Sequence, residues 1–105
     1  MSAASLDDLV TKLESIIVAA DSDLARWIVR VCHLLHVRLS EDATSAGLHY
    51  RVARIAGIAA RDARIDSSTI LANRIIDHCL LAISEGRLEA PLSTLEELNY
   101  LRLQL

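Results

Sequence analysis

The chain has 105 residues and a formal net charge of −3 at pH 7; 52% of its residues are hydrophobic, yet only 3% are aromatic. This length suits a single domain with one core, so we expect no second domain. No unbroken apolar run is longer than that of residues 16–20, which falls far short of the ~20 residues that cross a bilayer. The first residues lack the basic and apolar regions of a secretory signal, and we therefore expect a cytoplasmic protein.

The first forty residues predict two helices. Apolar residues recur at the three-and-four spacing of a helical face from Leu6 to Ile17, which predicts a helix over about residues 6–20 with Ser5 and Asp8 as a capping box. A second helix follows in "DSDLARWIVRVCHLLHVRLS", with Arg26, Arg30 and His33 on its outer side. Its predicted buried side comprises Leu24, Trp27, Ile28, Val31, Leu34, Leu35 and Leu39.

A third and a fourth helix are predicted in the middle of the chain. The third is expected to begin between Ser40 and Ser45, where "SEDATS" offers cap residues, and to carry an apolar stripe from Leu48 to Ala63. "DSS" at 66–68 supplies a turn and the next N-cap. The fourth helix, over about residues 69–85, is apolar around most of its circumference, which predicts that it forms the centre of the fold.

A fifth helix is predicted at the C-terminus. Gly86 suits the left-handed residue after a helix, Pro91 marks the following loop, and Ser93 with Glu96 forms a capping box. No stretch shows strand alternation, so we predict an all-α, compact bundle of about five helices in a single domain. Cys32 and Cys79 lie in apolar helical stretches and are expected to pack as small hydrophobic side chains, without a disulfide.

The most informative stretch is "HYRVARIAGIAARDAR", residues 49–64. On a helical wheel Arg51, Arg54, Arg61 and Arg64 occupy one arc of about 140°, with Tyr50 inside it and the alanines opposite. The basic middle of the chain supports a special role for this edge: eight arginines stand against four acidic residues over 26–74, whereas both ends are acidic. Few acidic residues lie four positions from these arginines in the sequence, where they could form ion pairs along the same helix.

Three partners for this arginine edge remain open. The arginines can pair with acidic residues of the end helices, contact nucleic-acid backbone with Tyr50 stacking on a base, or dock on an acidic protein. We also expect apolar positions on outer helix faces, namely Val29, Val37 and Leu81, to join the chain to copies of itself or to a larger assembly.

Two resemblances to known families arise from short segments. "AARDARIDSSTILANR" resembles a DNA-binding helix-turn-helix, which implies that Ser67, Ser68, Asn73 and Arg74 approach DNA, although Arg64 stands where that family usually has glycine. "CHLLH" is similar to histidine-containing phosphotransfer domains in that His33 projects outward, but the lysine and glycine that follow the phosphorylated histidine there are missing.

Neither a catalytic nor a metal-binding function is predicted. Cys32, His33 and His36 with His78 and Cys79 match no strong zinc spacing, and no nucleophile elbow or phosphate-cradling glycine loop is present. We expect no cofactor and no small-molecule substrate. The sequence predicts a non-enzymatic helical binding subunit that contacts nucleic-acid backbone; the alternatives are a protein-interaction module of adaptor, antitoxin or inhibitor type, and a helix-turn-helix regulator.

Overall fold

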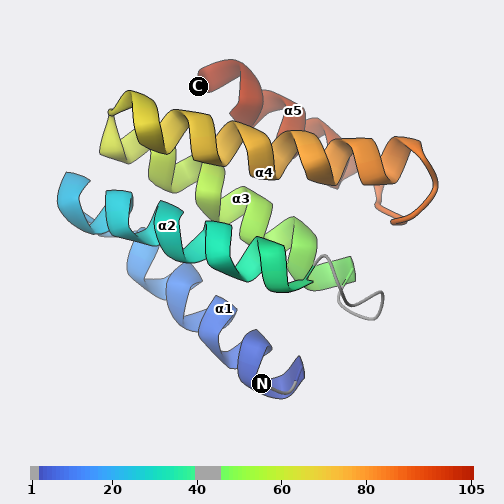
Figure 1. Cartoon of the computed structure of the whole chain (residues 1–105), viewed down its shortest axis with the longest axis horizontal. Helices are drawn as coiled ribbons and strands as arrows, with labels where there is room; N and C mark the ends of the chain where they lie inside the picture. The colour runs from blue at the N-terminus through green and yellow to red at the C-terminus, as the bar shows by residue number, and fades with distance from the viewer. Residues whose placement is uncertain (1–2, 40–45) are drawn as a thin grey trace.

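Five helices make up the regular structure of residues 3–39 and 46–105, which are the residues that the computed structural model describes (Figure 1). The predicted all-α bundle is therefore confirmed. The predicted start of the third helix, between Ser40 and Ser45, falls outside the described residues. The helices are α1 (Ala3–Ile17), α2 (Ser22–Leu39), α3 (Ala46–Ala63), α4 (Asp66–Ser84) and α5 (Leu92–Gln104).

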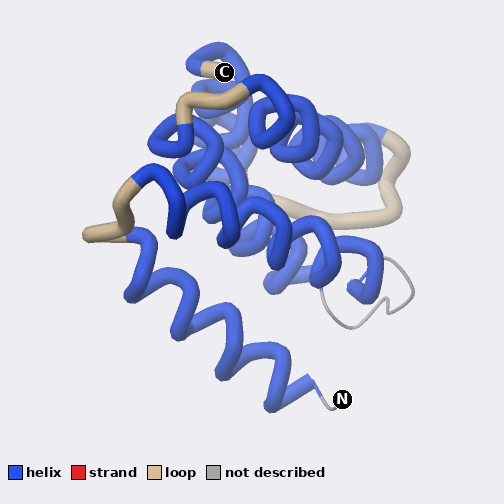
Figure 2. The backbone as a smooth tube through the Cα atoms, turned by 60° about the vertical axis from the view of Figure 1, so that its left-hand side comes forward, coloured by secondary structure: helices blue, strands red, loops and turns tan. Residues whose placement is uncertain are grey.

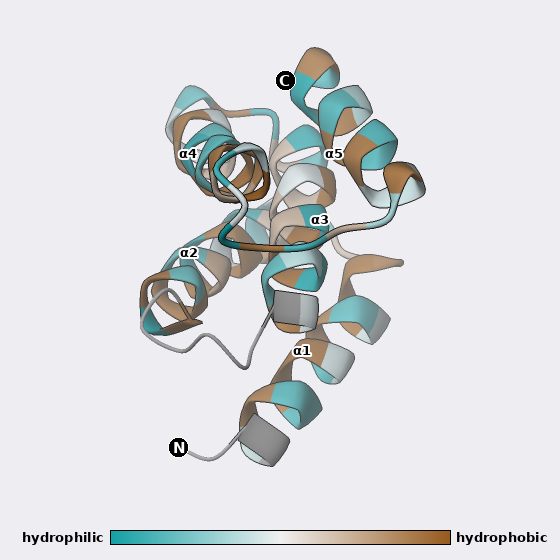
Figure 3. Ribbon diagram, turned by 90° about the vertical axis from the view of Figure 1, so that its right-hand side faces the viewer, coloured by the Kyte–Doolittle hydropathy of each residue, from teal (hydrophilic) through white to brown (hydrophobic). Residues whose placement is uncertain are grey.

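Helix α3 is the centre of the bundle. It packs against each of the other four helices, and Figure 3 shows it between α2 and α4 on one side and α1 and α5 on the other. Its small residues Ala53, Ala56, Gly57 and Ala60 are buried, so neighbouring helices approach its backbone closely. The prediction that the fourth helix is central was wrong, because α4 leaves part of its apolar circumference in solvent.

Helices α2 and α4 lie side by side across one face of the molecule. Residues 64–65 connect α3 to α4, which folds back along α3 as the second arm of a helical hairpin (Figure 1). Figure 2 shows that the connection from α4 to α5 is longer. It begins with Glu85, and the next residue, Gly86, has a φ of 75°, which is the left-handed conformation that the sequence predicted.

The buried side of α2 agrees with the prediction at Ile28, Leu35 and Leu39 but differs from it elsewhere. Trp27 and Leu34 are exposed, whereas Val29, which we expected on the outer face, is completely buried. The buried stripe instead follows the smaller side chains Ala25, Val29 and Cys32. Such side chains allow the close approach of α2 to the alanine-rich α3, its main packing partner. Val29 is therefore a core residue and no longer a candidate interface residue.

Several helix ends also differ from the predicted ones. Helix α1 begins before Ser5, so the predicted capping box there is wrong. At the start of α2, Asp21 is the capping residue, because its Oδ1 accepts a hydrogen bond from the backbone N–H of Leu24 at 2.8 Å. Residues 66–68 lie inside α4, and Pro91 occupies the N-cap position of α5 without a side-chain cap. Ser93 and Glu96 therefore lie within α5 and do not form its N-terminal cap.

Both cysteines are buried free thiols, as predicted. Burial raises the pKa of Cys32 to about 12 and that of Cys79 to about 11.

Among residues 3–39 and 46–105, no helix is sufficiently long and apolar to cross a membrane.

Candidate binding surface

Arg51 and Arg54 connect α3 to the acidic helices at the two ends of the chain. Arg51 pairs with Glu14 and Asp7 of α1, with its Nη2 donating to Oε1 of Glu14 at 2.5 Å. The hydrogen bonds to Glu14 raise the pKa of Arg51 above its ordinary value, and those to Asp7 add to this effect. Arg54 pairs with Glu97 of α5. Both guanidinium groups are therefore neutralised by carboxylates of the same chain.

The rest of the predicted arginine edge is only weakly paired. Arg61 lies 3.5 Å from the carboxylate of its neighbour Asp62 and 3.5 Å from the side-chain oxygen of Gln104. Arg64 is exposed and forms no ion pair with the described residues. The hydroxyl of Tyr50 donates to the backbone carbonyl of Glu89, so the ring is held against the α4–α5 connection. The five predicted residues thus share no continuous free cationic edge.

Arg64 has a structural role at the end of α3. Its φ is 56°, and its backbone N–H donates to the carbonyl of Ala60 at 3.2 Å, which closes the last turn of the helix. A non-glycine residue in this left-handed conformation costs about 1–2 kcal/mol. Glycine would adopt the same φ without that cost.

We expect Arg64→Gly to raise the free energy of unfolding by about 1 kcal/mol, because relief of the backbone strain exceeds the added entropy of the unfolded chain. Urea unfolding at neutral pH measures the change. Arg61→Gly is the matched control: it lies within α3 and should lower stability by about 1 kcal/mol. Equal destabilisation by both substitutions would show that the Arg64 side chain stabilises the fold.

The four helix-turn-helix residues do not all lie on one accessible surface. Ser67 and Arg74 are exposed, but Ser68 is only 3% exposed. The Oδ1 atom of Asn73 is also buried and has no hydrogen-bond partner in the part of the chain that the structure describes. Readout of base edges requires these side chains to project from one accessible helix face. Only two of the four predicted DNA-contacting residues have that freedom.

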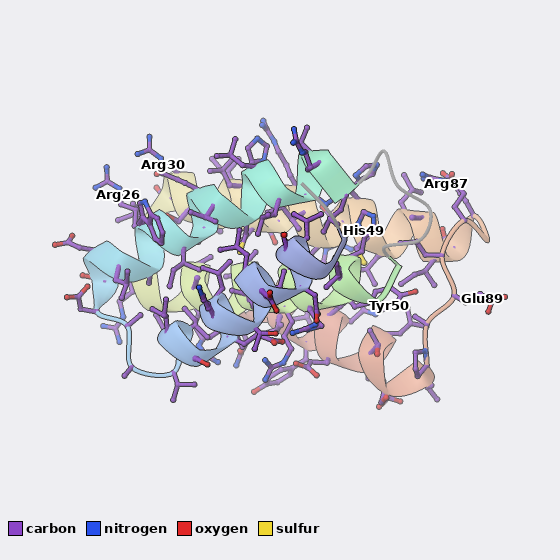
Figure 4. The ribbon with its side chains drawn as sticks, turned by 90° about the horizontal axis from the view of Figure 1, so that it is seen from below. Arg26, Arg30, His49, Tyr50, Arg87 and Glu89 are labelled. Atoms are coloured by element: carbon purple, nitrogen blue, oxygen red, sulfur yellow. The ribbon has the colours of Figure 1, made fainter. Side chains whose placement is uncertain are left out.

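Unpaired arginines are found instead on α2 and α4. We define the α2–α4 face by the exposed arginines and the large apolar residues of these two helices, which are more than half exposed. None of the arginines pairs with a carboxylate of the described residues. Figure 4 shows Arg26 and Arg30 projecting from α2 into solvent. The face comprises Arg26, Arg30, Arg38 and Arg74 with Trp27, Leu34, Val37, Ile70 and Leu81.

The sequence predicts part of this face, because Arg26 and Arg30 fall on the outer side of the second helix and Val37 and Leu81 fall at outer positions. Both apolar residues are exposed. The same pattern assigns Trp27 and Leu34 to the core, and that prediction is wrong. One signal could have identified the cationic, partly apolar side of α2. Arg26 and Arg30 are four residues apart, as are Leu34 and Arg38, and residues at this spacing lie on the same side of a helix.

The N-terminal ends of α2 and α4 enclose a pocket of about 120 Å³. Arg26 and Arg30 line it from α2, and Ser67, Ser68 and Leu71 line it from α4. The same two arginines, with Asp23 and Trp27, line a second and shallower hollow of about 180 Å³ on the outside of α2. Both arginines therefore border a concave site and the open surface.

Histidines from three helices meet at the opposite end of the α2–α4 contact. Nε2 of His36 lies 2.8 Å from Nδ1 of His78, and the ring of His49 stands edge-on to that of His36, with 5.9 Å between ring centroids. Burial, followed by repulsion from His78, His49 and His33, lowers the pKa of His36 to about 4. The cluster therefore holds a neutral His36 at neutral pH.

His33 is half-buried, and its Nδ1 is enclosed without a hydrogen-bond partner from the described residues. It does not project outward as the similarity to phosphotransfer domains implied. In the described ranges 3–39 and 46–105, no group of three or more histidine, cysteine or acidic side chains is arranged to hold a metal ion.

Comparisons with protein-family models, with curated proteins and with solved structures gave no match.

Proposed function

We propose that this chain is a helical protein-interaction module whose α2–α4 face binds an acidic, amphipathic helix of a partner protein. One observation carries the proposal: four arginines without ion pairs from the described residues are interspersed with five exposed large apolar side chains on two adjacent helices. The predicted contact with an anionic partner is kept, but the cations that make it belong to α2 and α4.

The charges of the chain favour an acidic partner at this face. Arg51 and Arg54 satisfy the acidic residues of α1 and α5, whereas Arg26, Arg30 and Arg74 are left for an external carboxylate. Arginine suits this task because its planar fork pairs with carboxylates in a fixed geometry. Complementary charge also speeds association and rejects basic partners.

The apolar residues favour a protein helix over nucleic acid. Leu34, Val37 and Leu81 offer no hydrogen bonds to phosphates or bases, yet they remain more than half exposed. Exposed apolar groups of this kind gain free energy when covered by the apolar side of an amphipathic helix, about 25 cal/mol for each Å² removed from water. Nucleic-acid backbone would leave them in water.

The proposal predicts charge-selective binding of a designed helical peptide. A glutamate- and leucine-rich amphipathic peptide should bind, whereas a lysine-rich peptide with the same leucine positions should not. Arg30→Glu should weaken the acidic peptide at least about tenfold, because a cation is replaced by a repelling charge. Fluorescence anisotropy of the labelled peptides at low and physiological salt measures both effects.

Lys12→Glu is the matched control, since Lys12 is an exposed cation of α1 without an ion pair to the described residues. It makes the same change in net charge away from the face and should leave binding unchanged. Equal losses for Lys12→Glu and Arg30→Glu would contradict the proposal. The proposal would also be contradicted if a single-stranded or duplex oligonucleotide bound more strongly than the acidic peptide and its affinity fell steeply with salt.

A further inference from the structure

The pocket between α2 and α4 combines three features of an oxyanion site. Two guanidinium groups, Arg26 and Arg30, border it from α2. The hydroxyl-bearing residues Ser67 and Ser68 border it from the first turn of α4, which begins at Asp66. The backbone N–H groups of a first helical turn have no acceptor within the helix and carry the positive end of its dipole. Donors from two helices thus converge on one space.

Ser68 supplies an independent indication of a ligand. Ser68 is only 3% exposed, and it lines the pocket. It forms no hydrogen bond with any residue that the structure describes. Its Oγ is not among the buried side-chain atoms that lack a partner in the described residues, which are His33 Nδ1 and Asn73 Oδ1, so the hydroxyl is open to an acceptor within the pocket. The N-cap position of α4 adds no competing acceptor, because Ile65 provides no side-chain cap.

The donors around the pocket match a phosphate group better than a carboxylate. A volume of about 120 Å³ is well above the roughly 30 Å³ that one water occupies in the liquid. Two arginine forks, two serine hydroxyls and the free N–H groups offer more donors than the two oxygens of a carboxylate accept. A phosphate monoester presents three strong acceptor oxygens with a charge of about −1.5 to −2.

The nearby carboxylates do not close the pocket. Asp23 lies in the outer hollow with Arg26 and Arg30, but no ion pair joins it to either arginine. Asp66 is exposed at the start of α4 and is not among the lining residues. Both guanidinium groups therefore remain available to an anion.

We propose that this pocket binds a phosphate monoester carried by a phosphorylated serine or threonine of the partner's acidic helix. The identity of the carrier rests on the proposed function, whereas the affinity of the pocket for the phosphate group does not. Phosphorylation of the partner is then the event that strengthens the complex, because the phosphate occupies a site that glutamate fits poorly.

Phenyl phosphate is the probe for the pocket alone. In a heteronuclear NMR titration at constant ionic strength, it should shift the backbone amide signals of Ser67 and Ser68 in a saturable manner, and benzoate should not. Inorganic phosphate in a parallel titration distinguishes a free anion from a monoester: weaker binding of the free anion supports a carried phosphate. Absence of saturable shifts with phenyl phosphate, or equal shifts with benzoate, would overturn the proposal.

Three variants assign the effect to the pocket. Ser68→Ala and Arg30→Gln should each weaken phenyl phosphate about tenfold or more, as expected for loss of a hydrogen bond to a charged group. Arg38→Gln removes the same charge from α2 outside the pocket and should leave affinity unchanged. Ser68→Ala should keep its fold, because it removes a hydroxyl that makes no hydrogen bond with the described residues and leaves a side chain of similar size. Equal weakening by Arg38→Gln would identify a diffuse charge effect and overturn the proposal.

A pair of acidic peptides, identical except for one phosphoserine, separates the two proposals. Tighter binding of the phosphorylated peptide by about tenfold or more, lost in Ser68→Ala, supports the pocket. Equal binding of both peptides overturns the phosphate site and leaves the proposed function standing. Saturable binding of phenyl phosphate with no binding of either peptide overturns the proposed function and leaves the phosphate site standing.

Discussion

Gly57→Val is expected to lower the free energy of unfolding by about 3 kcal/mol, because this glycine lies where α3 meets α4 and α5. A Cβ atom added at residue 57 would lie 3.1 Å from Cδ1 and 3.2 Å from Cβ of Leu101, and 3.2 Å from Cδ1 of Ile76. Overpacking of this kind typically costs about 1–3 kcal/mol. The Cβ of Leu101 is attached directly to the α5 backbone, so the helix itself must move.

Gly47→Val is the matched control for this substitution. A Cβ at residue 47 would meet nothing within 4 Å, so the change should alter stability by no more than about 0.5 kcal/mol. Gly57→Ala should fall between the two, since its gain in helix propensity of about 1 kcal/mol opposes the closer contact. Urea unfolding curves of the three variants measure the order. A Gly57→Val protein as stable as Gly47→Val would show that α5 is not seated against α3 as described.

The arginine edge illustrates which part of a site can be predicted from sequence. The wheel placed Arg51 and Arg54 on the outer side of a helix, and both do leave the alanine stripe. Pairing with the acidic end helices was among the predicted alternatives, but the particular carboxylates could not be predicted, because Glu14 and Glu97 are separated from Arg51 and Arg54 by 37 and 43 residues. A search at i,i+4 detects neighbours on one helix only. Long-range pairs depend on which helices meet, and that depends on packing.

The buried side of α2 was mispredicted for a related reason. Apolar residues surround much of this helix, so periodicity alone permitted two stripes that differ by a rotation. The larger side chains Trp27 and Leu34 suggested one stripe, but the folded chain buries the stripe that contains Ala25 and Cys32. Close packing against α3, whose buried side chains are small, decides which of the two stripes is buried. The fold class was predictable because it depends on the spacing of apolar residues and on the residues that end helices. Both are local features of the sequence.

The stability of the fold is expected to fall by about 3 kcal/mol as the pH is lowered from about 6.5 to about 4, because of His36. Burial, with repulsion from His78, His49 and His33, lowers its pKa from 6.5 to about 4 in the folded protein. Between these values the unfolded chain binds a proton that the folded chain excludes. The contribution of His36 is therefore complete above about pH 6.5, and it is lost progressively down to about pH 4.

His36→Gln should remove this pH dependence and retain a side chain able to hydrogen-bond His78. His78→Gln should reduce it only in part, because repulsion from His78 is a smaller cause than burial. Urea unfolding at about pH 7 and about pH 4.5 measures the difference for each protein, and an NMR titration of the His36 ring should give a midpoint near pH 4. Parallel pH profiles for the wild type and His36→Gln would contradict this assignment.

Because Val37 follows His36 and Leu81 lies one turn beyond His78, protonation that separates the two rings would also displace the apolar end of the α2–α4 face. Binding of the acidic peptide should therefore weaken near pH 4, where His36 of the folded protein takes up its proton, and it should do so less in His36→Gln.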